Sequence, residues 1–461
     1  MQSKYDVIII GAGPAGIFAA LELVNDKNNI RILMIEKGSD IKRRVCPSRE
    51  KHNRCVNCAP CATVCGWGGA GAFSDGKLTL SSEVGGHLDQ YIGEEALHAM
   101  ISYVDGIYLR YGAPEEVYGV KCADKLEEIR KQATLAGLRL VPLPIRHLGT
   151  GRCAQILQKM FEDLSAQTDI RTDLQVTGII TKDNAVLGVE TGDGQVFTAD
   201  YVIAAPGREG SEWLTAQAHR LGLSTTVNPV DIGVRVELPA VVMENLTSLF
   251  YELKCTYVSQ TFEDRVRTFC MNPYGEVVME NNNGVITVNG HSHAYNKTEN
   301  TNFALLVSKN FTEPFREPIT YGRSIAKLAN LLGGGVLVQR VGDLVNGRRS
   351  TREKIERGLV RATLSEATPG DLSLVFPYRH LMGIVEMLKA LDHIAPGVFS
   401  RDTLLYGAEV KFYSSRLTLN QGLETKIKNL FAAGDGAGVT RGLVQASAAG
   451  VVAAREILRR V

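Results

Sequence analysis

The sequence predicts an α/β fold in which a parallel sheet, interrupted along the chain, is combined with an inserted antiparallel α+β domain. Three observations predict it. An apolar run, a glycine-rich turn and a helical pattern follow one another at 5–24. A second strand–turn–helix pattern closes the chain at 429–460. Between them, apolar and polar residues alternate, which is typical of antiparallel strands with one open face.

The composition is that of an ordinary globular protein. The chain has 461 residues, of which 44% are hydrophobic and 22% are charged, and its formal net charge is +1. This length suggests two or three domains. The near-neutral charge and the lack of a long basic run exclude a nucleic-acid partner. The apolar run at 7–10 is too short to span a membrane and no signal-peptide pattern is present, so we expect a cytoplasmic protein without a membrane span.

The first domain is expected over residues 1–237. Its opening is a βαβ unit with a strand at 5–10, a helix at 14–24 and a strand at 30–36. A cysteine-rich and glycine-rich loop at 46–79 follows. The further elements expected in this domain are helices at 92–112, 122–136 and 151–167, strands at 173–181, 186–191 and 195–205, and a crossover strand at 231–237.

The inserted domain is expected over residues 238–400, and the first domain returns over 401–461. The elements expected in the insertion are strands at 249–258, 265–271, 276–280 and 284–289, and helices at 318–332, 352–365 and 381–392. The returning segment carries a strand at 429–433 and a closing helix at 442–460.

The turn after the first strand has the spacing of a dinucleotide fingerprint. Gly11 allows the tight turn, Gly13 lets the backbone approach a pyrophosphate, and Gly16 lets helix and strand pack closely. The helix N-terminus that follows offers free N–H groups and a positive dipole end to phosphates. Glu36, at the end of the next strand, can accept hydrogen bonds from both ribose hydroxyls, which favours FAD or NAD over NADP.

Two later motifs favour FAD. One is the strand and turn at 201–207, and the other is the strand and glycine turn at 429–436. Asp435 is placed to bind a ribityl hydroxyl, and the helix that starts at 441–444 can direct its N–H groups at the flavin pyrimidine. Such a helix end stabilises negative charge on a reduced flavin.

The segments VIIIGAGPAG, IAAPG and LFAAGDGAG resemble the three FAD motifs of the glutathione-reductase-type flavoproteins. The resemblance implies a discontinuous Rossmann-like FAD-binding domain, with Val176 contacting the adenine through its backbone. The cofactor-binding residues expected from the motifs and the resemblance are Gly11, Gly13, Pro14, Ala15, Gly16, Glu36, Lys37, Gly69, Gly71, Ala72, Val176, Ala205, Gly207, Gly434, Asp435, Gly442, Leu443 and Val444.

A narrower resemblance concerns the loop and the insertion. The blocks GWGGAGAFSDGKLTL, TFCMNPYGEVV and NGHSHAYNKTENTNFALLV resemble a family of FAD-dependent dehydrogenases of unassigned substrate. The layout is more distantly similar to geranylgeranyl reductases and flavin hydroxylases, which insert a sheet domain over the flavin. The chain has no second GxGxxG after a strand, so it lacks the separate NAD(P)H domain of the disulfide reductases.

Four cysteines form a compact run, Cys55, Cys58, Cys61 and Cys65, and Cys46 lies upstream. The spacing matches a ferredoxin-type iron–sulfur motif, with Cys65 or Cys46 as the fourth ligand. A structural zinc site, a redox dithiol made by the last two cysteines and unligated thiols are the alternatives. The cytosol keeps thiols reduced, so structural disulfides are not expected.

The glycine-rich segment 66–77 is expected to lie against the flavin, with Lys77 near its edge or on the surface. In the insertion, His291, His293 and Tyr295 share one strand face, and the two histidines are candidate proton donors. Three basic segments are candidate anion clamps, although a solvated or salt-bridged surface is the simpler interpretation of each: 42–44, 348–349 and 378–380.

Three functions remain open from the sequence. The leading one is an FAD-dependent oxidoreductase that transfers hydride to or from a small organic substrate. Its electrons come from a transient NAD(P)H or from a protein donor through an iron–sulfur cluster. The second is a flavin thiol–disulfide oxidoreductase that uses Cys61 and Cys65. The third is a flavin redox sensor or electron relay without turnover.

Overall fold

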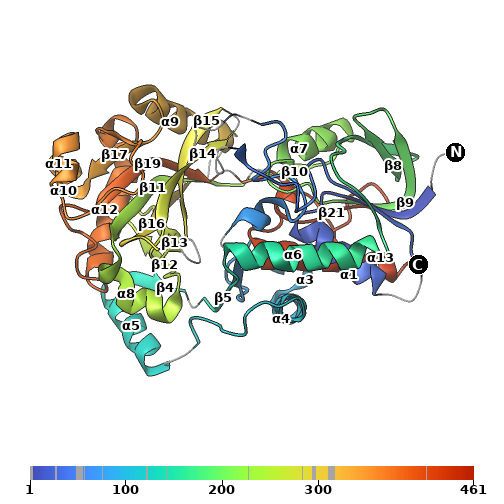
Figure 1. Ribbon diagram of the computed structural model, residues 1–461, viewed down its shortest axis with the longest axis horizontal. Helices are drawn as coiled ribbons and strands as arrows, with labels where there is room; N and C mark the ends of the chain where they lie inside the picture. Colours follow the sequence, from blue (N-terminus) through green and yellow to red (C-terminus); the bar gives the residue numbers. More distant parts are fainter. Residues whose placement is uncertain are drawn as a thin grey trace. The chain divides into compact units, whose positions relative to one another are not determined.

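A computed structural model describes most of the chain (Figure 1). The described residues are 4–25, 29–47, 56, 58–74, 76–120, 123–141, 143–226, 228–282, 284–292, 297–309, 317–411 and 413–461. The chain forms two compact units. The first consists of Met1–Glu116, Arg146–Asn228 and Tyr413–Val461, and the second consists of Val117–Ile145 and Pro229–Phe412.

The unit boundaries fall at 228/229 and 412/413, whereas the sequence led us to expect 237/238 and 400/401. The reason is strand pairing. The segment expected to be a crossover, β11 (Val230–Pro239), pairs along its length with β19 (Leu404–Lys411) in the sheet of the second unit. Residues 117–145 also join the second unit, since β4 (Leu138–Leu140) pairs with β12 (Cys255–Val258).

The first unit is built on a largely parallel sheet, as the sequence predicts. At its centre, β1 (Lys4–Ile10) pairs in parallel with β2 (Ile32–Ile35) and with β9 (Val196–Ala204). The last strand, β21 (Leu430–Ala432), pairs in parallel with β9. Residues 7–10 are buried without alternation, as expected for a parallel strand that is covered on both faces. The remaining strands are β6 (Asp169–Arg171), β7 (Val176–Lys182) and β8 (Ala185–Thr191).

Helices α1 (Pro14–Val24), α6 (Thr150–Ser165) and α13 (Leu443–Leu458) lie together beside this sheet (Figure 1). Small residues allow α1 and α13 to approach closely. A Cβ at Gly450 would lie 2.0 Å from the backbone oxygen of Ala15. The first and last segments of the chain therefore share one core, which brings their N-terminal turns to the same edge of the sheet. The other long helices of this unit are α4 (Glu94–Arg110) and α7 (Ser211–Arg220).

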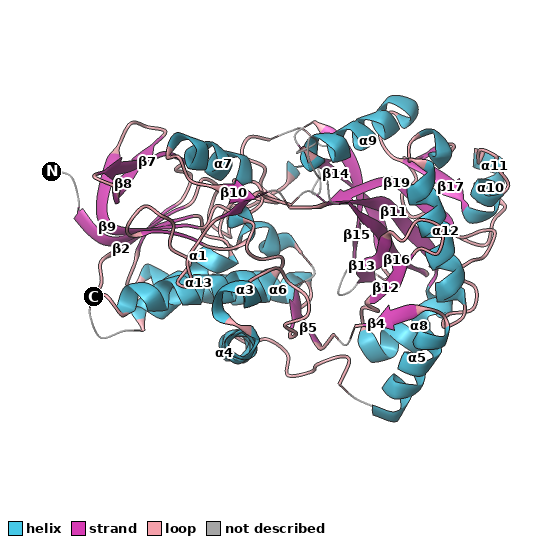
Figure 2. Ribbon diagram, turned by 180° about the vertical axis from the view of Figure 1, so that it is seen from behind, coloured by secondary structure: helices cyan, strands magenta, loops and turns pink. Residues whose placement is uncertain are grey.

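Among the described residues, the second unit holds an eight-stranded sheet in the order β18-β17-β19-β11-β16-β13-β12-β4. Its other strands are β13 (Arg265–Asn272), β16 (Asn300–Lys309), β17 (Leu337–Arg340) and β18 (Thr368–Pro369). Every pairing in it is antiparallel except β17 with β18. One face is apolar and packs against α8 (Ala240–Phe250), α9 (Pro318–Gly333) and α12 (Tyr378–Asp392), and Figure 2 shows α8 and α12 against the strands.

The opposite face of this sheet is polar yet buried. Along β11, Asp231, Arg235 and Glu237 alternate with the apolar residues, and each is at most 1% exposed. The hairpin of β14 (Glu276–Asn282) and β15 (Val285–His291) packs on this side, with its own small apolar cluster. This arrangement differs from the solvent-exposed polar face that usually accompanies an antiparallel sheet.

Several expected elements differ from the structure. The expected strand 249–258 is divided, because α8 continues to Phe250 and β12 begins at Cys255. The expected helix 352–365 ends early as α11 (Arg352–Glu356), close to Gly358. Strands β16 and β19 were not expected, since they are buried on both faces and lack the alternation that signals a strand. Among the described residues, no helix is both long and apolar enough to cross a membrane.

Candidate functional site

Three turns meet at the carboxyl edge of the first unit's sheet. They follow β1, β9 and β21, and adjacent backbones are joined there by hydrogen bonds from Ala205 N to Ile10 O, 2.8 Å, and from Ala433 N to Ala204 O, 3.0 Å. A Cβ at Gly11, whose φ is +97°, would lie 2.3 Å from Ala205 O. Only glycine permits this approach. The motifs that are far apart in the sequence are therefore neighbours in space.

Gly13 is the exception among these glycines. It precedes α1 with φ −78° and ψ −177°, and a Cβ built on it meets no described atom within 4 Å. Packing within the protein therefore does not require glycine at 13, whereas a Cβ at Gly16 would lie 1.9 Å from Gly11 O. The open space lies at the first turn of α1, where backbone N–H groups have no intrahelical partner. A phosphate group fits this space and these donors.

Glu36 is buried, and its carboxylate accepts hydrogen bonds from the backbone N–H groups of three residues. Its Oε2 accepts a hydrogen bond from Ala12 N at 2.8 Å. Its Oε1 accepts from Gly38 N at 2.9 Å and from Gly66 N at 2.8 Å. A carboxylate offers about four acceptor sites. Three backbone donors use three of these sites, so one acceptor site of Glu36 remains unused.

Arg44 is a site residue that sequence reasoning assigned to a surface or to an anion clamp. Arg43 is exposed and pairs with Asp40 and Asp173, whereas Arg44 is only 4% exposed. Its Nε donates to Ala62 O at 3.0 Å. Its Nη1 donates to the backbone oxygens of residues 67 and 69, at 2.6 and 2.8 Å.

The remaining nitrogen of Arg44, Nη2, is buried without a hydrogen-bond partner among the described residues. Burial lowers the pKa of Arg44 to about 10, so the guanidinium stays charged at neutral pH. A buried cation with an unused donor is costly unless an anion meets it. The carboxylate of Glu36 and the ring of Phe73 lie near this guanidinium, and Nη2 remains as a donor for a further acceptor.

Asp435 follows the last strand of the sheet. Thr440 Oγ1 donates to its Oδ1 at 2.9 Å, and Arg208 lies 3.4 Å from its Oδ2. Burial raises the pKa of Asp435, and Arg208 opposes that rise. Gly442 N, just before α13, lies 3.4 Å from the same carboxylate. The carboxyl group therefore lies at the N-terminus of the closing helix, which begins with Leu443 and Val444.

The glycine-rich loop runs along both helix starts. Gly68 N donates to Ala12 O at 2.7 Å. A Cβ at Gly69 would lie 3.2 Å from Gly13 Cα, and one at Gly71 would lie 2.6 Å from the side chain of Leu443. Ala72 is buried within the same short 3₁₀ helix, Gly69–Phe73. The loop thus covers the starts of α1 and α13.

Four other residues that the sequence assigned to the site belong to this unit. Lys37 forms an ion pair with Glu209, which follows the turn after β9. Val176 begins β7 two residues after Leu174, whose N donates to Glu36 O at 3.0 Å. Gly207, with φ +66°, faces the last turn, since a Cβ at Gly436 would lie 2.4 Å from Gly207 O. Lys77 begins β3 (Lys77–Thr79) and is half-buried.

The cysteine segment is only partly described, and Cys55 lies outside the described residues. Cys61 and Cys65 flank one turn, with Cys65 N donating to Cys61 O at 2.9 Å. Among the described residues, no group of three or more His, Cys, Asp or Glu side chains is arranged to hold a metal ion. Burial raises the pKa of the Cys65 thiol to about 11, which disfavours a reactive thiolate at neutral pH. Cys46 and Cys58 are at least partly exposed.

The predicted residues of the second unit are described separately. His291 ends β15, opposite Glu276, whereas His293 and Tyr295 lie outside the described residues. Arg379 pairs with Asp264, as the simpler interpretation of that segment predicted. His380 is buried, and neither ring nitrogen has a hydrogen-bond partner in the described part of the chain. Burial lowers its pKa to about 4, so His380 is neutral at physiological pH.

The polar face of the second unit carries residues that sequence reasoning missed. Arg235 and Glu409, both fully buried, form a bidentate ion pair, in which Arg235 Nε donates to Glu409 Oε2 at 2.8 Å and Nη2 donates to Oε1 at 2.7 Å. Glu237 accepts from Tyr406 OH at 2.5 Å, and burial raises its pKa. The sequence did carry a signal for these residues, because charged residues stand at alternate positions of a strand whose other positions are apolar. Buried charges of this kind are enriched at functional sites.

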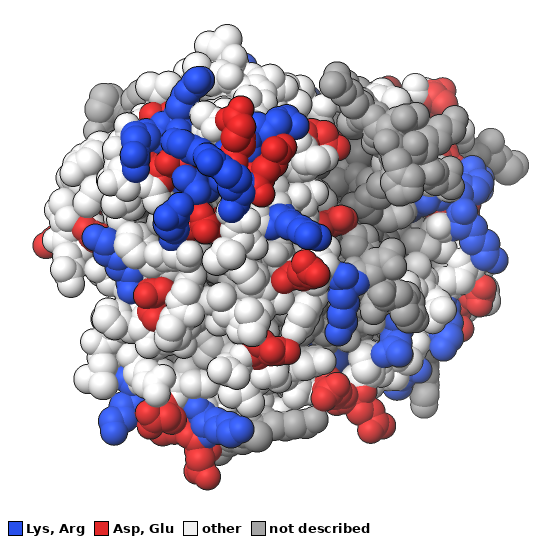
Figure 3. Space-filling model, turned by 60° about the vertical axis from the view of Figure 1, so that its left-hand side comes forward, with Lys and Arg blue, Asp and Glu red and all other residues white. Residues whose placement is uncertain are grey.

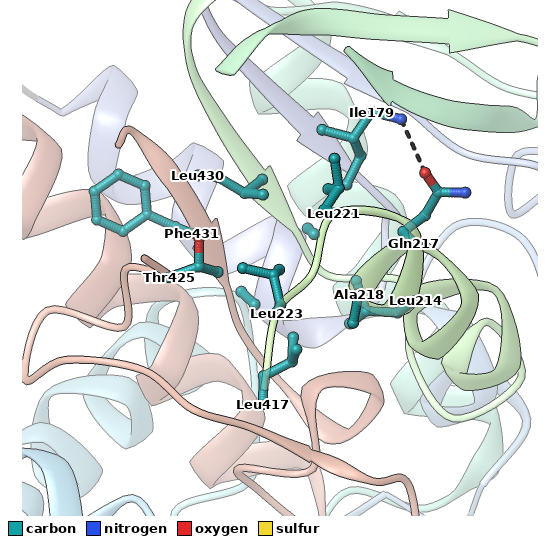
Figure 4. Close-up of a pocket in the computed structure, with 12 residues that line it drawn as sticks. Ile179, Leu214, Gln217, Ala218, Leu221, Leu223, Leu417, Thr425, Leu430 and Phe431 are labelled. Carbon is teal, nitrogen blue, oxygen red and sulfur yellow. Dashed lines mark hydrogen bonds between the residues drawn. The ribbon is translucent and has the colours of Figure 1, made fainter. Parts of the chain in front are cut away.

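A small apolar cavity lies in the first unit between α7 and the ends of β9 and β21 (Figure 4). Leu214, Leu221, Leu430 and Phe431 are among the residues that line it. The cavity has room for about one water and for no substrate, so it is a small gap in the packing of the core.

Lys and Arg side chains gather in one region of the view in Figure 3, with Asp and Glu among them. The segment 340–361 is the arginine-rich part of the second unit, and Arg348 and Arg349 are exposed in it. Its anchor is the buried Asp343. Burial by itself raises the pKa of Asp343, but hydrogen bonds from Arg340, Ser350 and Lys354 outweigh it and lower the pKa to about 2.

Residues 229–412 match the protein family described as FAD-dependent protein, C-terminal domain-like. This range corresponds to the main segment of the second unit. An uncharacterized protein of Clostridium beijerinckii is 27% identical over 492 residues, covering 100% of this chain and 82% of the relative.

Solved structures of flavoenzymes share the fold. Formate oxidase has a TM-score of 0.50 at 13% identity, over 100% of this chain and 99% of that one. Glycine oxidase from Geobacillus kaustophilus has a TM-score of 0.42 at 14% identity, over 100% of this chain and 95% of that one. L-Proline dehydrogenase from P. horikoshii has a TM-score of 0.43 at 10% identity, over 100% of this chain and 95% of that one. Of the three, only formate oxidase reaches a TM-score of 0.50, and at 13% identity this likeness concerns the fold alone.

The dinucleotide turns of the first unit and the family match of the second define one class of protein. The first unit has a Rossmann-like dinucleotide-binding fold shared with formate oxidase, and the second unit carries a domain of FAD-dependent proteins. The fold class expected from the sequence is thereby confirmed, and the family match agrees with the expected class of FAD-dependent enzyme and with FAD as its cofactor.

Proposed function

We propose that the three turns of the first unit hold one FAD. The start of α1, with Gly13, and Arg44 bind the pyrophosphate. Glu36 accepts a ribose hydroxyl of the adenosine, and Asp435 accepts a ribityl hydroxyl. The observation that carries the proposal is the meeting of these turns beside the unused donor of Arg44.

We propose that the reaction is the transfer of a hydride to or from a small organic substrate. Bound FAD supplies a ring that accepts or releases two electrons. The chain supplies the surroundings of that ring. The N-terminus of α13 stabilises negative charge, and Lys77 is our candidate for a second positive group. His291 and His293 are our candidates for proton donors to the substrate.

We propose that electrons reach the flavin from a protein donor through an iron–sulfur cluster on Cys55, Cys58 and Cys61, with Cys65 or Cys46 as the fourth ligand. A transient NAD(P)H is the alternative donor. The loop that follows these cysteines supports the first route, because Gly66 N donates to Glu36 and Gly68 N donates to Ala12 O. The loop that directly follows Cys65 is thus hydrogen-bonded to Ala12 and Glu36, next to the residues that we assign to FAD.

Anaerobic purification tests this proposal. The purified chain is expected to show flavin absorption with a broad shoulder near roughly 400 nm, together with matching iron and acid-labile sulfide. Cys61→Ser is expected to lose iron, whereas Cys255→Ala, at a buried strand position, is expected to keep it. Flavin without iron, together with rapid flavin reduction by NADPH, contradicts the cluster and favours direct NAD(P)H oxidation.

The two other functions have separate tests. A thiol–disulfide oxidoreductase requires Cys61 and Cys65, and the burial of the Cys65 thiol does not favour it. If Cys65→Ser has the same turnover as the wild type, the thiol–disulfide hypothesis is wrong. A redox sensor or relay binds FAD but turns over no small molecule, so a measured turnover excludes it.

A further inference from the structure

The polar face of the second unit holds a cluster of cations around one aromatic ring. The ring belongs to Phe269 of β13. Arg267 lies over it with its Cζ 4.7 Å from the centroid. The Nζ atoms of Lys254 and Lys411 lie at 5.2 and 5.8 Å. We call these four residues the Phe269 cluster. Their cationic side chains are only 11–13% exposed.

These side chains come from strands that are not neighbours. Lys411 ends β19, and β11 and β16 separate it from Phe269 on β13. The strands between carry small or apolar residues where the side chains converge. Phe269 stands opposite Ala304, and Gly233 stands between Leu306 and Glu409. A Cβ at Gly233 would lie 1.8 Å from Leu305 O, so the backbones approach closely there. Long side chains from both sides of these central strands reach the same ring.

Each cation is held in place by an acid. Lys411 lies 3.1 Å from Glu409, which also holds Arg235. Arg267 pairs with the buried Asp231, and Lys254 lies 4.0 Å from Glu252. The acids fix the geometry of the cations, so an arriving anion meets donors that are already oriented. Preorganised charge of this kind in a partly dry site is what strengthens anion binding.

A second observation points to a ligand on the same face. Beside Arg235, Asn272 and Asn302 are at most 1% exposed. Asn302 Oδ1 accepts hydrogen bonds from Arg235 Nη1 and Asn272 Nδ2, both at 3.2 Å, which fixes both amides. Their outer atoms, Asn302 Nδ2 and Asn272 Oδ1, have no partner among the described residues. One donor and one acceptor therefore remain for a bound molecule or its water.

We propose that this face is the substrate-recognition surface, and that the Phe269 cluster binds the carboxylate of a small organic acid. The proposal rests on the proposed oxidoreductase function and names its substrate class. The carboxylate accepts hydrogen bonds from Arg267 and Lys411, and planar groups stack on the ring of Phe269. The unused amide atoms near Arg235 serve polar groups of the same molecule.

Calorimetric titration of the FAD-loaded, full-length chain tests the proposal, with benzoate as the probe and benzamide as its uncharged counterpart. Benzoate is expected to bind with a Kd at least tenfold lower than that of benzamide. Lys411→Met is expected to weaken benzoate binding about tenfold. Glu409 keeps both bonds from Arg235 in this variant, so we expect it to fold.

Lys389→Met is the matched control. Its Nζ lies 5.6 Å from the ring of Phe399 in the same unit, so it loses a comparable lysine–ring contact outside the cluster. Unchanged benzoate binding in this control supports the proposal. Equal binding of benzoate and benzamide, no binding of either, or equal effects of the two lysine variants overturns it. If Lys411→Met does not fold, Lys254→Met replaces it. Flavin content is measured on the same samples, so a failure of the FAD proposal is seen separately.

Discussion

Replacing Gly13 by alanine separates a cofactor role from a folding role. In the protein alone, the added Cβ meets no described atom within 4 Å, and φ −78° is ordinary backbone for alanine. Reduced freedom of the unfolded chain stabilises the variant by roughly 0.4–1 kcal/mol. A poorer residue at the helix start costs a similar amount. We therefore expect the unfolding free energy of the apoprotein to change by less than roughly 1 kcal/mol.

The same methyl group occupies the space that we assign to the pyrophosphate. We expect FAD affinity to fall at least tenfold, which is about 1.4 kcal/mol. Apoprotein is titrated with FAD by fluorescence, and urea unfolding is followed by circular dichroism. Gly450→Ala is the control, because its Cβ would lie 2.0 Å from Ala15 O. It is expected to lose roughly 1–3 kcal/mol of stability from overpacking. Unchanged FAD affinity in Gly13→Ala refutes the assignment.

Three other substitutions address two residues of the same unit, Glu36 and Arg44, and one residue of the second unit, Asp343. Glu36→Gln keeps one acceptor oxygen and is expected to lose roughly 1–3 kcal/mol in urea unfolding, because a buried N–H is left unpaired; no loss contradicts its structural role. Arg44→Met is expected to weaken FAD binding tenfold or more, while the exposed Arg43→Met does not; equal effects contradict the buried-anion assignment. Asp343, with a folded pKa of about 2 against an ordinary 3.8, stabilises the fold above about pH 4 and loses this contribution as the pH falls towards 2. The stability gap between wild type and Asp343→Asn is expected to be about 2 kcal/mol at pH 5 and to shrink towards pH 3; a constant gap contradicts this.

The dinucleotide turns were predictable because their signal is local. Gly11, Gly16 and Glu36 stand at fixed spacings around a strand and a helix. Gly16 packs on Gly11 O and Glu36 accepts from Ala12 N, both within that βαβ unit, although Ala205 O also constrains Gly11. The return of the chain was predictable for the same reason, since Asp435 and Gly442 carry a second local pattern.

The residues that were missed depend on contacts between distant segments. Arg235 and Glu409 are 174 residues apart, and neither shows in its own surroundings that the other neutralises it. In the sequence, Arg44 cannot be distinguished from its exposed neighbour Arg43. In the folded chain, three backbone carbonyl oxygens of the loop at 62–69 accept hydrogen bonds from Arg44. The central strands of the second sheet, β16 and β19, lack alternation because both of their faces are buried.

The cofactor released from the purified chain tests the central claim most directly. Heat-denatured protein is analysed by chromatography for FAD, FMN and riboflavin. The three turns and Arg44 form a site for a dinucleotide, so we predict one FAD per chain and no FMN. Release of FMN, or failure of the apoprotein to take up FAD, would contradict the account, because neither leaves a role for Glu36 and Arg44 as residues that hold the adenosine and the pyrophosphate.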